Sequence, residues 1–172
     1  ITLAGSGEPT LNSRFHEVIQ YVRKNSKIKT VLLTNGSLFN IPEVRSGAAR
    51  AHVVKVSLSA WDQRSYTWVN RPHPSIYFKQ YIDGLKRFRD QFHGELWMEV
   101  FLVWGMNSTI SDVTKIAVLA EQIVPDRIQL NTAVRPPAED FVEPVPRDNI
   151  AALCDLFRPA AAGSSGLSPP AG

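Results

Sequence analysis

Glu8 and the residues around it have the types and spacing expected of a ligand-binding turn. The chain opens with an apolar run that breaks at Gly5 and continues as Ser6-Gly7-Glu8-Pro9-Thr10. Two glycines flanking a serine permit backbone angles closed to other residues and let a ligand approach the backbone closely. Pro9 has no N–H group and favours an extended conformation at Glu8. The turn therefore exposes backbone N–H groups and one carboxylate, which suits a small anionic or zwitterionic ligand.

Further small polar residues follow the next apolar runs, at the points where strands are expected to end. They are Thr34 and Asn35 after the run 31–33, Ser57 and Ser59 on one face of the run 53–60, and Asn131 after the run 127–130. The carboxyl ends of parallel strands meet at one edge of a sheet, where α/β proteins bind ligands. Turn or cap formation is the simpler explanation for any one of these residues, but it explains less well why only one edge carries them.

Glu99 interrupts the apolar run 96–103, where a charge is costly unless it is paired or hydrated. Two interpretations stay open, namely a functional carboxylate inside a barrel cavity and a buried ion pair with Arg71 or Arg135. His73 lies in a long loop, 61–74, at the same expected edge, where it is placed to contact a substrate. The histidines show no paired metal-ligand spacing, and Cys154 is the only cysteine, so no multi-cysteine metal site can be built from this chain alone.

The hydrophobic pattern predicts five short strands separated by helices, in the order β-α-β-α-β-α-β-α-β-α. Helical spacing is clearest after Ser75, which we expect to cap the helix whose apolar stripe runs from Phe78 to Phe92. Strands with helices between them indicate a parallel sheet with right-handed crossovers. The pattern leaves open whether this sheet curls into part of a barrel or stays open. One domain is expected at 1–158, and a disordered tail at 159–172, where Ala, Gly, Ser and Pro dominate.

Composition argues against several classes of protein. The 172 residues carry a net charge of +3 with scattered basic residues, so nucleic-acid binding receives little weight. No apolar stretch approaches the roughly 18–20 residues of a membrane span. A single cysteine rules out an internal disulfide, and a reducing cytoplasm is the expected location. Because Ile1 opens directly inside a predicted strand, further chain is expected upstream.

The order of these motifs resembles the radical S-adenosylmethionine (radical SAM) superfamily. The matching series is GSGEPT, LLTNGSL, VSLSAWD followed by VNRP, EVFLVWGMN and RIQLNTAVRPP, which together cover 1–146. The series is most similar to the branch of iron–sulfur oxidoreductases related to wyosine-type tRNA-modifying enzymes. The resemblance implies an α/β fold, a partial (β/α)6 TIM-type barrel with parallel strands, from which the first βα unit is missing.

The resemblance also implies roles for the residues at the strand ends. In the family, the backbone of a Gly-Gly-Glu-like motif holds the methionine amino group of S-adenosylmethionine. The residues that match this motif are Gly5, Ser6, Gly7 and Glu8. Those matching positions that contact methionine and ribose are Thr34, Asn35, Ser57 and Ser59, while Asn131 matches a region near adenine. Candidate substrate residues are Arg71, His73, Glu99 and Arg135. Two positions depart from the family: wyosine-type relatives tend to have Arg in place of Glu99, and many relatives have Asp in place of Ser59.

The family requires a Cys-x3-Cys-x2-Cys loop after its first strand to hold a 4Fe-4S cluster. This chain has neither the loop nor that strand, so the cluster ligands are expected upstream of Ile1 and no metal ligand is assigned here. We therefore interpret the chain as the C-terminal part of a radical SAM oxidoreductase that reductively cleaves S-adenosylmethionine to a 5′-deoxyadenosyl radical. The fragment alone is expected to be inactive.

The same interpretation predicts partners. The full-length enzyme would act on a small molecule or a tRNA and would take electrons from a donor such as flavodoxin or ferredoxin. No membrane partner is expected. The apolar edge at 1–4 would be unpaired in the fragment, and exposed edges invite pairing with a second copy of the chain.

Two other classes of function stay open. A cluster-free barrel enzyme would use Glu8 or Glu99 as a general base. A non-enzymatic chain would be a module that binds S-adenosylmethionine or another small molecule, or a subunit that borrows its cluster from a partner. Three closely spaced cysteines encoded upstream would favour the radical enzyme, whereas a native start near Ile1 would favour the binding module.

Overall fold

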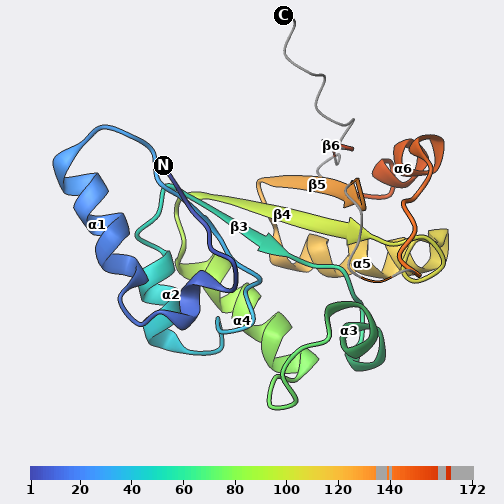
Figure 1. Ribbon diagram of the computed structural model, residues 1–172, viewed down its shortest axis with the longest axis horizontal. Coiled ribbons are helices and arrows are strands. Elements are labelled where there is room, and N and C mark those ends of the chain that lie inside the picture. Colours follow the sequence, from blue (N-terminus) through green and yellow to red (C-terminus); the bar gives the residue numbers. More distant parts are fainter. Residues whose placement is uncertain (135–138, 140, 159–161, 164–172) are drawn as a thin grey trace, which may run out of the picture.

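The computed structural model describes residues 1–134, 139, 141–158 and 162–163. Within them, short strands alternate with helices along the chain (Figure 1). The strands form one six-stranded sheet in the order β1-β2-β3-β4-β5-β6, and each neighbouring pair is parallel. The parallel α/β architecture predicted from the sequence is confirmed.

The strands are short and follow the predicted apolar runs. Their bounds are β1 Thr2–Leu3, β2 Val31–Leu33, β3 Val53–Ser57, β4 Glu95–Leu102, β5 Arg127–Thr132 and β6 Ala162–Gly163. The helices are α1 Phe15–Asn25, α2 Pro42–Ala48, α3 Gln63–Asn70, α4 Phe78–Gln91, α5 Ile110–Ile123 and α6 Arg147–Cys154, with a short 3-10 helix, η1, at Pro9–Leu11.

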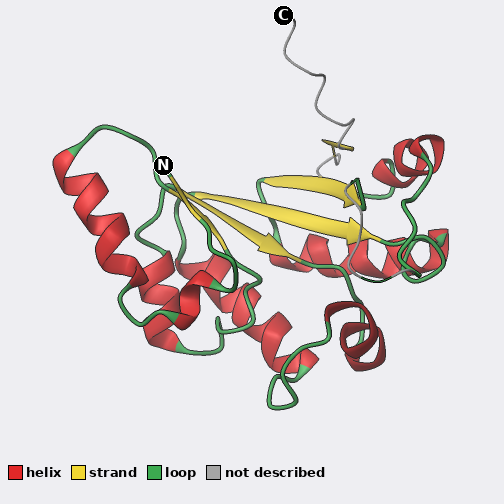
Figure 2. Ribbon diagram, in the orientation of Figure 1, coloured by secondary structure: helices red, strands yellow, loops and turns green. Residues whose placement is uncertain are grey.

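The helices α1, α2, α4 and α5 all lie on the same side of the sheet (Figure 2). Strand β4 shows the consequence, because its side chains alternate between the two faces. Leu96, Met98, Val100 and Leu102 have no exposed surface and belong to the hydrophobic core between sheet and helices. The alternate residues from Glu95 to Phe101 point to the opposite side. We call this second side the open face. In a partial barrel, this face of the sheet forms the interior of the barrel.

Three local predictions need correction. The expected long loop at 61–74 contains helix α3, which begins with a capping box between Asp62 and Ser65 that the hydrophobic pattern did not reveal. Ser75 does not cap the next helix: α4 begins at Phe78, after Tyr77, without a side-chain cap. Strand β3 ends at Ser57 and not at residue 60.

Of the predicted tail 159–172, the structure describes 162–163, which pair with β5 as strand β6. The remainder of that prediction lies outside the described residues. Among the helices that are described, none has the length and apolar character needed to cross a membrane.

Candidate functional site

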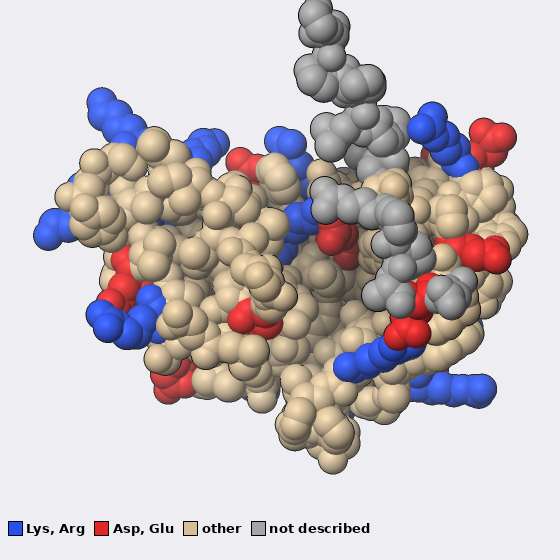
Figure 3. Space-filling model, viewed as in Figure 1, with Lys and Arg blue, Asp and Glu red and all other residues tan. Residues whose placement is uncertain are grey.

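A cleft of about 480 Å³ opens where β1, β2 and β3 end. Its walls are residues 4–5 and 7–9 from the loop after β1, residues 33–35 from the end of β2, and Lys55, Ser57 and Glu99 from β3 and β4. We call it the strand-end cleft. Its volume falls within the range of about 300–1,000 Å³ that small-molecule sites occupy. Figure 3 shows the corresponding side of the molecule hollowed near its centre, with acidic and basic side chains beside the hollow.

The glycines of the first loop keep the mouth of the strand-end cleft open. A Cβ atom added at Gly7 would meet no atom within 4 Å, and one at Gly5 would make only ordinary contacts with Gly7. The two glycines permit backbone angles closed to other residues, but neither has positive φ; among the described glycines only Gly36 and Gly105 do. Glycine at position 7 therefore provides access to the cleft and not an unusual backbone conformation.

The carboxylate of Glu8 joins the loop after β1 to the end of β2. Its Oε1 atom accepts hydrogen bonds from Thr10 N at 3.1 Å, Thr10 Oγ1 at 2.6 Å and Thr34 Oγ1 at 2.5 Å. Its Oε2 atom accepts one from Asn35 N at 2.6 Å. Both oxygens are thus occupied by donors of the protein itself. Glu8 is consequently a positioning residue, and the alternative that it serves as a free general base is disfavoured.

Glu99 lies on the open face in a polar row that crosses three strands. Its Oε1 atom is 2.5 Å from Nζ of Lys55 on β3 and also accepts a hydrogen bond from the side-chain amide of Asn131 on β5. The Lys55 and Glu99 side chains are 20% and 29% exposed. The carboxylate therefore has the basic partner that a charge in a strand requires.

The expected pairing of Glu99 with Arg71 is wrong. Arg71 instead pairs with Glu139 at 2.7 Å, and Arg135 lies outside the described residues. Lys55 was missed by the sequence analysis, although its place in the run 53–57 was a usable signal. A lysine two residues before Ser57 in a strand must share the face of that serine.

Ser59 and Asn131 do not line the strand-end cleft as expected. Ser59 is buried, and its Oγ atom accepts a hydrogen bond from Phe101 N at 3.0 Å, so the hydroxyl extends the pairing of β3 with β4. Asn131 supports Glu99 from β5. Ser6 is exposed, and the walls of the cleft do not include it. Of the predicted cofactor residues, the cleft brings together Gly5, Gly7, Glu8, Thr34, Asn35 and Ser57.

Arg71 and His73 line a second cleft of about 490 Å³, here called the side cleft. Its other walls are Glu8 and Leu11, residues 35, 37 and 38, Tyr66, residues 70 and 72, and residues 75–76. Glu8 and Asn35 line both clefts and so form a shared wall. The candidate substrate residues are thus divided, with Glu99 in one cleft and Arg71 and His73 in the other.

Beyond the ends of β3 and β4, polar side chains hold loops together. Asn107 is fully buried; its Nδ2 atom donates to the carbonyl oxygens of Ser59 at 2.8 Å and Phe101 at 2.9 Å. Its Oδ1 atom accepts from Val103 N at 2.8 Å. A single amide thus satisfies three backbone groups that the strands leave unpaired. Asn107 was not predicted from the sequence.

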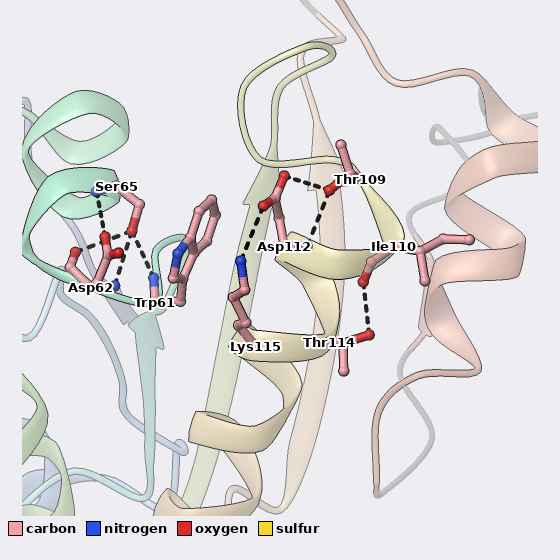
Figure 4. Close-up of polar contacts among 8 residues, drawn as sticks. All are labelled: Trp61, Asp62, Ser65, Thr109, Ile110, Asp112, Thr114 and Lys115. Atoms are coloured by element: carbon pink, nitrogen blue, oxygen red, sulfur yellow. Dashed lines mark hydrogen bonds and ion pairs between the residues drawn. The ribbon is translucent and has the colours of Figure 1, made fainter.

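The starts of α3 and α5 face each other across the Trp61 ring (Figure 4). Asp62 accepts a hydrogen bond from Ser65 N at 2.7 Å, and this bond lowers the pKa of the Asp62 carboxyl. Lys115 of α5 lies 5.0 Å from the ring centroid of Trp61 and 3.9 Å from the carboxylate of Asp112. The contact of Lys115 with the Trp61 ring joins the two helix starts, whereas the contacts of Asp62 and Asp112 lie within α3 and α5.

The described residues include no group of three or more His, Cys, Asp or Glu side chains that could hold a metal ion. Cys154 is partly buried at the end of α6. A 4Fe-4S cluster therefore does not fit the ligands that this part of the chain presents, because such a cluster needs several thiolates.

No family model matches the chain. Among curated proteins, it is 38% identical over 135 residues to GTPase Obg of Brachyspira hyodysenteriae, covering 78% of this chain and 20% of that protein. It is 34% identical over 158 residues to a UPF0026 protein of Helicobacter pylori, covering 91% of this chain and 50% of that protein. The chain thus spans at most about half the length of these two relatives.

Solved structures resemble the whole described fold. A domain of pyruvate-formate lyase-activating enzyme from Bacteroides vulgatus superposes with a TM-score of 0.73 at 14% identity, covering 95% of this chain and 97% of that one. A radical SAM methyltransferase from Sphaerobacter thermophilus gives a TM-score of 0.73 at 18% identity, covering 96% and 51%. Streptococcus suis SuiB bound to S-adenosylmethionine gives a TM-score of 0.65 at 16% identity, covering 90% and 34%.

At these identities the likeness concerns the fold, since one fold can host many chemistries. The agreement extends over nearly the entire chain and includes the single parallel sheet with alternating helices. The chain therefore has the partial-barrel α/β fold that is found in radical SAM enzymes.

Proposed function

We propose that the chain binds S-adenosylmethionine in the strand-end cleft, as part of a radical SAM enzyme. The observation that carries the proposal is the meeting of Gly5, Gly7, Thr34, Asn35 and Ser57 in one cleft at the carboxyl ends of neighbouring parallel strands. Ligands of α/β proteins bind at this edge. The fold shared with SuiB, which was solved bound to S-adenosylmethionine, adds support.

The residues of the cleft suit the two ends of S-adenosylmethionine. The methionine end is zwitterionic, and we assign it to the backbone of residues 5–7 together with the Lys55 and Glu99 pair, which offers both signs of charge. We assign the ribose hydroxyls to Asn35 and Ser57. The open space beside Gly7 leaves the backbone accessible to such a ligand.

In a radical SAM enzyme, S-adenosylmethionine bound at a reduced 4Fe-4S cluster supplies a 5′-deoxyadenosyl radical. The described residues do not provide the thiolates for that cluster, so no step of this chemistry is assigned to them. We propose that other residues of the full-length protein or a partner chain hold the cluster. Three points stay predictions for the whole protein. They are its place in the wyosine-related branch, its substrate (a small molecule or a tRNA) and its electron donor.

The runner-up is a module that binds S-adenosylmethionine without performing chemistry. The cluster-free enzyme is disfavoured by two observations. The Glu8 carboxylate accepts four hydrogen bonds from Thr10, Thr34 and Asn35, and Oε1 of Glu99 is held by Lys55 and Asn131. A carboxylate with its donors in place is poorly positioned to take a proton from a substrate.

Calorimetric titration with S-adenosylmethionine tests the proposal. Gly7→Val should preserve the fold, because the added atoms enter open space, yet narrow the cleft and weaken binding at least about tenfold. Ala151→Val, on the exposed surface of α6, is the matched control and should bind like the unaltered chain. Equal affinities of the two variants, or no measurable binding by the full-length protein with its cluster, would overturn the proposal.

The same titration addresses the role of the cluster. We expect this chain alone to bind S-adenosylmethionine weakly, because the backbone of residues 5–7 supplies neutral hydrogen bonds worth only about 0.5–1.5 kcal/mol each and the charges of Lys55 and Glu99 already pair with each other. The full-length protein with a reconstituted cluster should bind more tightly. Cleavage to 5′-deoxyadenosine by this chain alone would refute the assignment of the cluster to residues outside it.

A further inference from the structure

We propose that the side cleft binds the anionic group, a carboxylate or a phosphate, of a small substrate whose apolar body packs against the cleft walls. Its role as the substrate site rests on the function proposed above, whereas anion binding by the cleft does not. The cleft is separate from the S-adenosylmethionine site, and no residue of the pairing between Lys55 and Glu99 lines it.

Arg71 is the main candidate for the anion contact. It ends helix α3 in the left-handed conformation, with φ 46° and ψ 54°, which non-glycine residues seldom adopt. Its guanidinium lies 2.7 Å from Glu139 and 5.6 Å from the ring centroid of Phe141. The side chains of Arg71 and Glu139 are 57% and 47% exposed, and such exposed pairs are weak. An incoming carboxylate or phosphate can therefore replace Glu139 with bidentate hydrogen bonds.

The other polar groups of the side cleft favour an anion. Among the described residues that line it, Glu8 is the one carboxylate, and its oxygens are already occupied by Thr10, Thr34 and Asn35. His73 lines the same cleft, with Nδ1 2.8 Å from Ser75 Oγ. The side cleft thus offers hydrogen-bond donors and a cation, and the oxygens of the one carboxylate among its described lining residues are already engaged.

The rest of the wall is apolar and aromatic. Leu11, Leu38 and Ile76 supply aliphatic surface, and the buried Tyr66 ring supplies an aromatic wall. The Tyr66 hydroxyl is protonated at neutral pH, and burial raises its pKa further, to about 12. This combination suits a ligand with a compact apolar body next to its anionic group.

The wall shared by the two clefts gives the site its significance. Glu8 and Asn35 line both, and four hydrogen bonds hold the Glu8 carboxylate in place. A ligand in the side cleft would therefore lie directly across this wall from S-adenosylmethionine. Such an arrangement places a substrate beside the cofactor without overlap between the two.

Amide-resolved NMR titrations of this chain test the inference, with inorganic phosphate, benzoate and neutral benzamide as probes. Benzoate or phosphate should shift the amides of Asn35, Ser37 and the non-proline residues among 70–76 in a saturable manner, and benzamide should not. Response to benzoate alone identifies a carboxylate site, and stronger response to phosphate identifies a phosphate site. Absence of shifts with both anions, or equal shifts with benzamide, would overturn the proposal.

Variants locate the contact. Arg71→Gln should weaken binding of the responding anion about tenfold, the effect of losing a charge-assisted pair. Arg64→Gln removes an exposed arginine from the same helix and should leave binding unchanged. Arg71→Gly relieves the left-handed conformation and should fold at least as stably, yet lose binding, which separates loss of contact from loss of fold. Equal weakening by Arg64→Gln would contradict the role of Arg71.

The two proposals fail in different ways in these spectra. Binding of S-adenosylmethionine should shift the amides of Gly5, Gly7 and Ser57, and anion binding should shift those of the non-proline residues among 70–76. Anion shifts without S-adenosylmethionine shifts would refute the proposed function and leave the anion site standing. The opposite result would refute the anion site alone.

Discussion

The ends of β1 and β2 and the ends of β3 and β4 carry similar small polar residues but use them differently. At the first pair, Thr34 and Asn35 hold Glu8 while the surrounding loops remain open enough to line two clefts. At the second pair, Ser57 still lines the strand-end cleft, but beyond it the buried amide of Asn107 bonds Ser59 and Phe101 and closes that end. Polar residues at strand ends therefore indicate a ligand site only where the surrounding loops leave a cleft beside them, even when some of their groups bond a neighbouring loop.

Two serines of one segment illustrate the difference. Ser57 is half-buried at the end of β3 and lines the strand-end cleft. Ser59, two residues later, is buried and accepts a hydrogen bond from Phe101 N. Alternation in a continuous strand would have placed both on one face. The strand ends at Ser57, so that alternation does not extend to Ser59.

The largest expected effect comes from the closed end. Asn107→Ala would leave buried backbone groups of Ser59, Phe101 and Val103 without their partner. Because each unsatisfied buried group is costly, the free energy of unfolding should fall by about 3 kcal/mol. Urea denaturation measures this loss, and Asn149→Ala on the exposed surface of α6 is the control. A loss no greater than in that control would mean that the amide does not hold this end together.

At the open end, Glu8→Gln should have a smaller effect on stability. A carboxamide retains one acceptor oxygen but presents N–H groups where the carboxylate accepted hydrogen bonds, so donors would oppose donors. We expect a loss of about 2 kcal/mol, since hydrogen bonds to a charged group are lost. Urea denaturation and the amide shift of Asn35 report the change.

Glu121→Gln, an exposed position on α5, controls for the loss of a negative charge. If Glu8→Gln leaves both stability and the Asn35 amide unaltered, Glu8 does not join the two loops. Glu8 would then be available for the chemistry of the cluster-free alternative.

The smallest expected change in stability distinguishes Ser57 from Ser59. Ser59→Ala should destabilise the protein by about 1 kcal/mol, because Phe101 N loses its acceptor. Ser57→Ala should change stability by less than about 0.5 kcal/mol, as expected for a side chain outside such a network. Affinity for S-adenosylmethionine should respond in the reverse order, with the larger loss in Ser57→Ala. The comparison between closed and open ends fails if the two serines behave alike in both measurements.

Much of the candidate site was accessible from residue order. The apolar runs and their polar ends placed Gly5, Gly7, Glu8, Thr34, Asn35 and Ser57 at one edge, and the strand-end cleft brings them together. Lys55 and Asn107 were missed because their roles depend on residues far along the chain, Glu99 for the first and Ser59 for the second. Helix α3 was missed because its capping box is a local polar signal without a strong apolar stripe.

The sequence by itself determined the parallel α/β architecture, because the spacing of apolar residues sets which faces must be buried and alternating strands and helices allow few topologies. Only the tertiary structure decided which polar residues form hydrogen bonds within the protein and which remain available to a ligand. That choice depends on distances between loops distant in sequence, as between Glu8 and Asn35 or Asn107 and Ser59. Hydrogen bonds act over about 3 Å, so their pairing follows from the packed arrangement of loops and not from residue type or spacing.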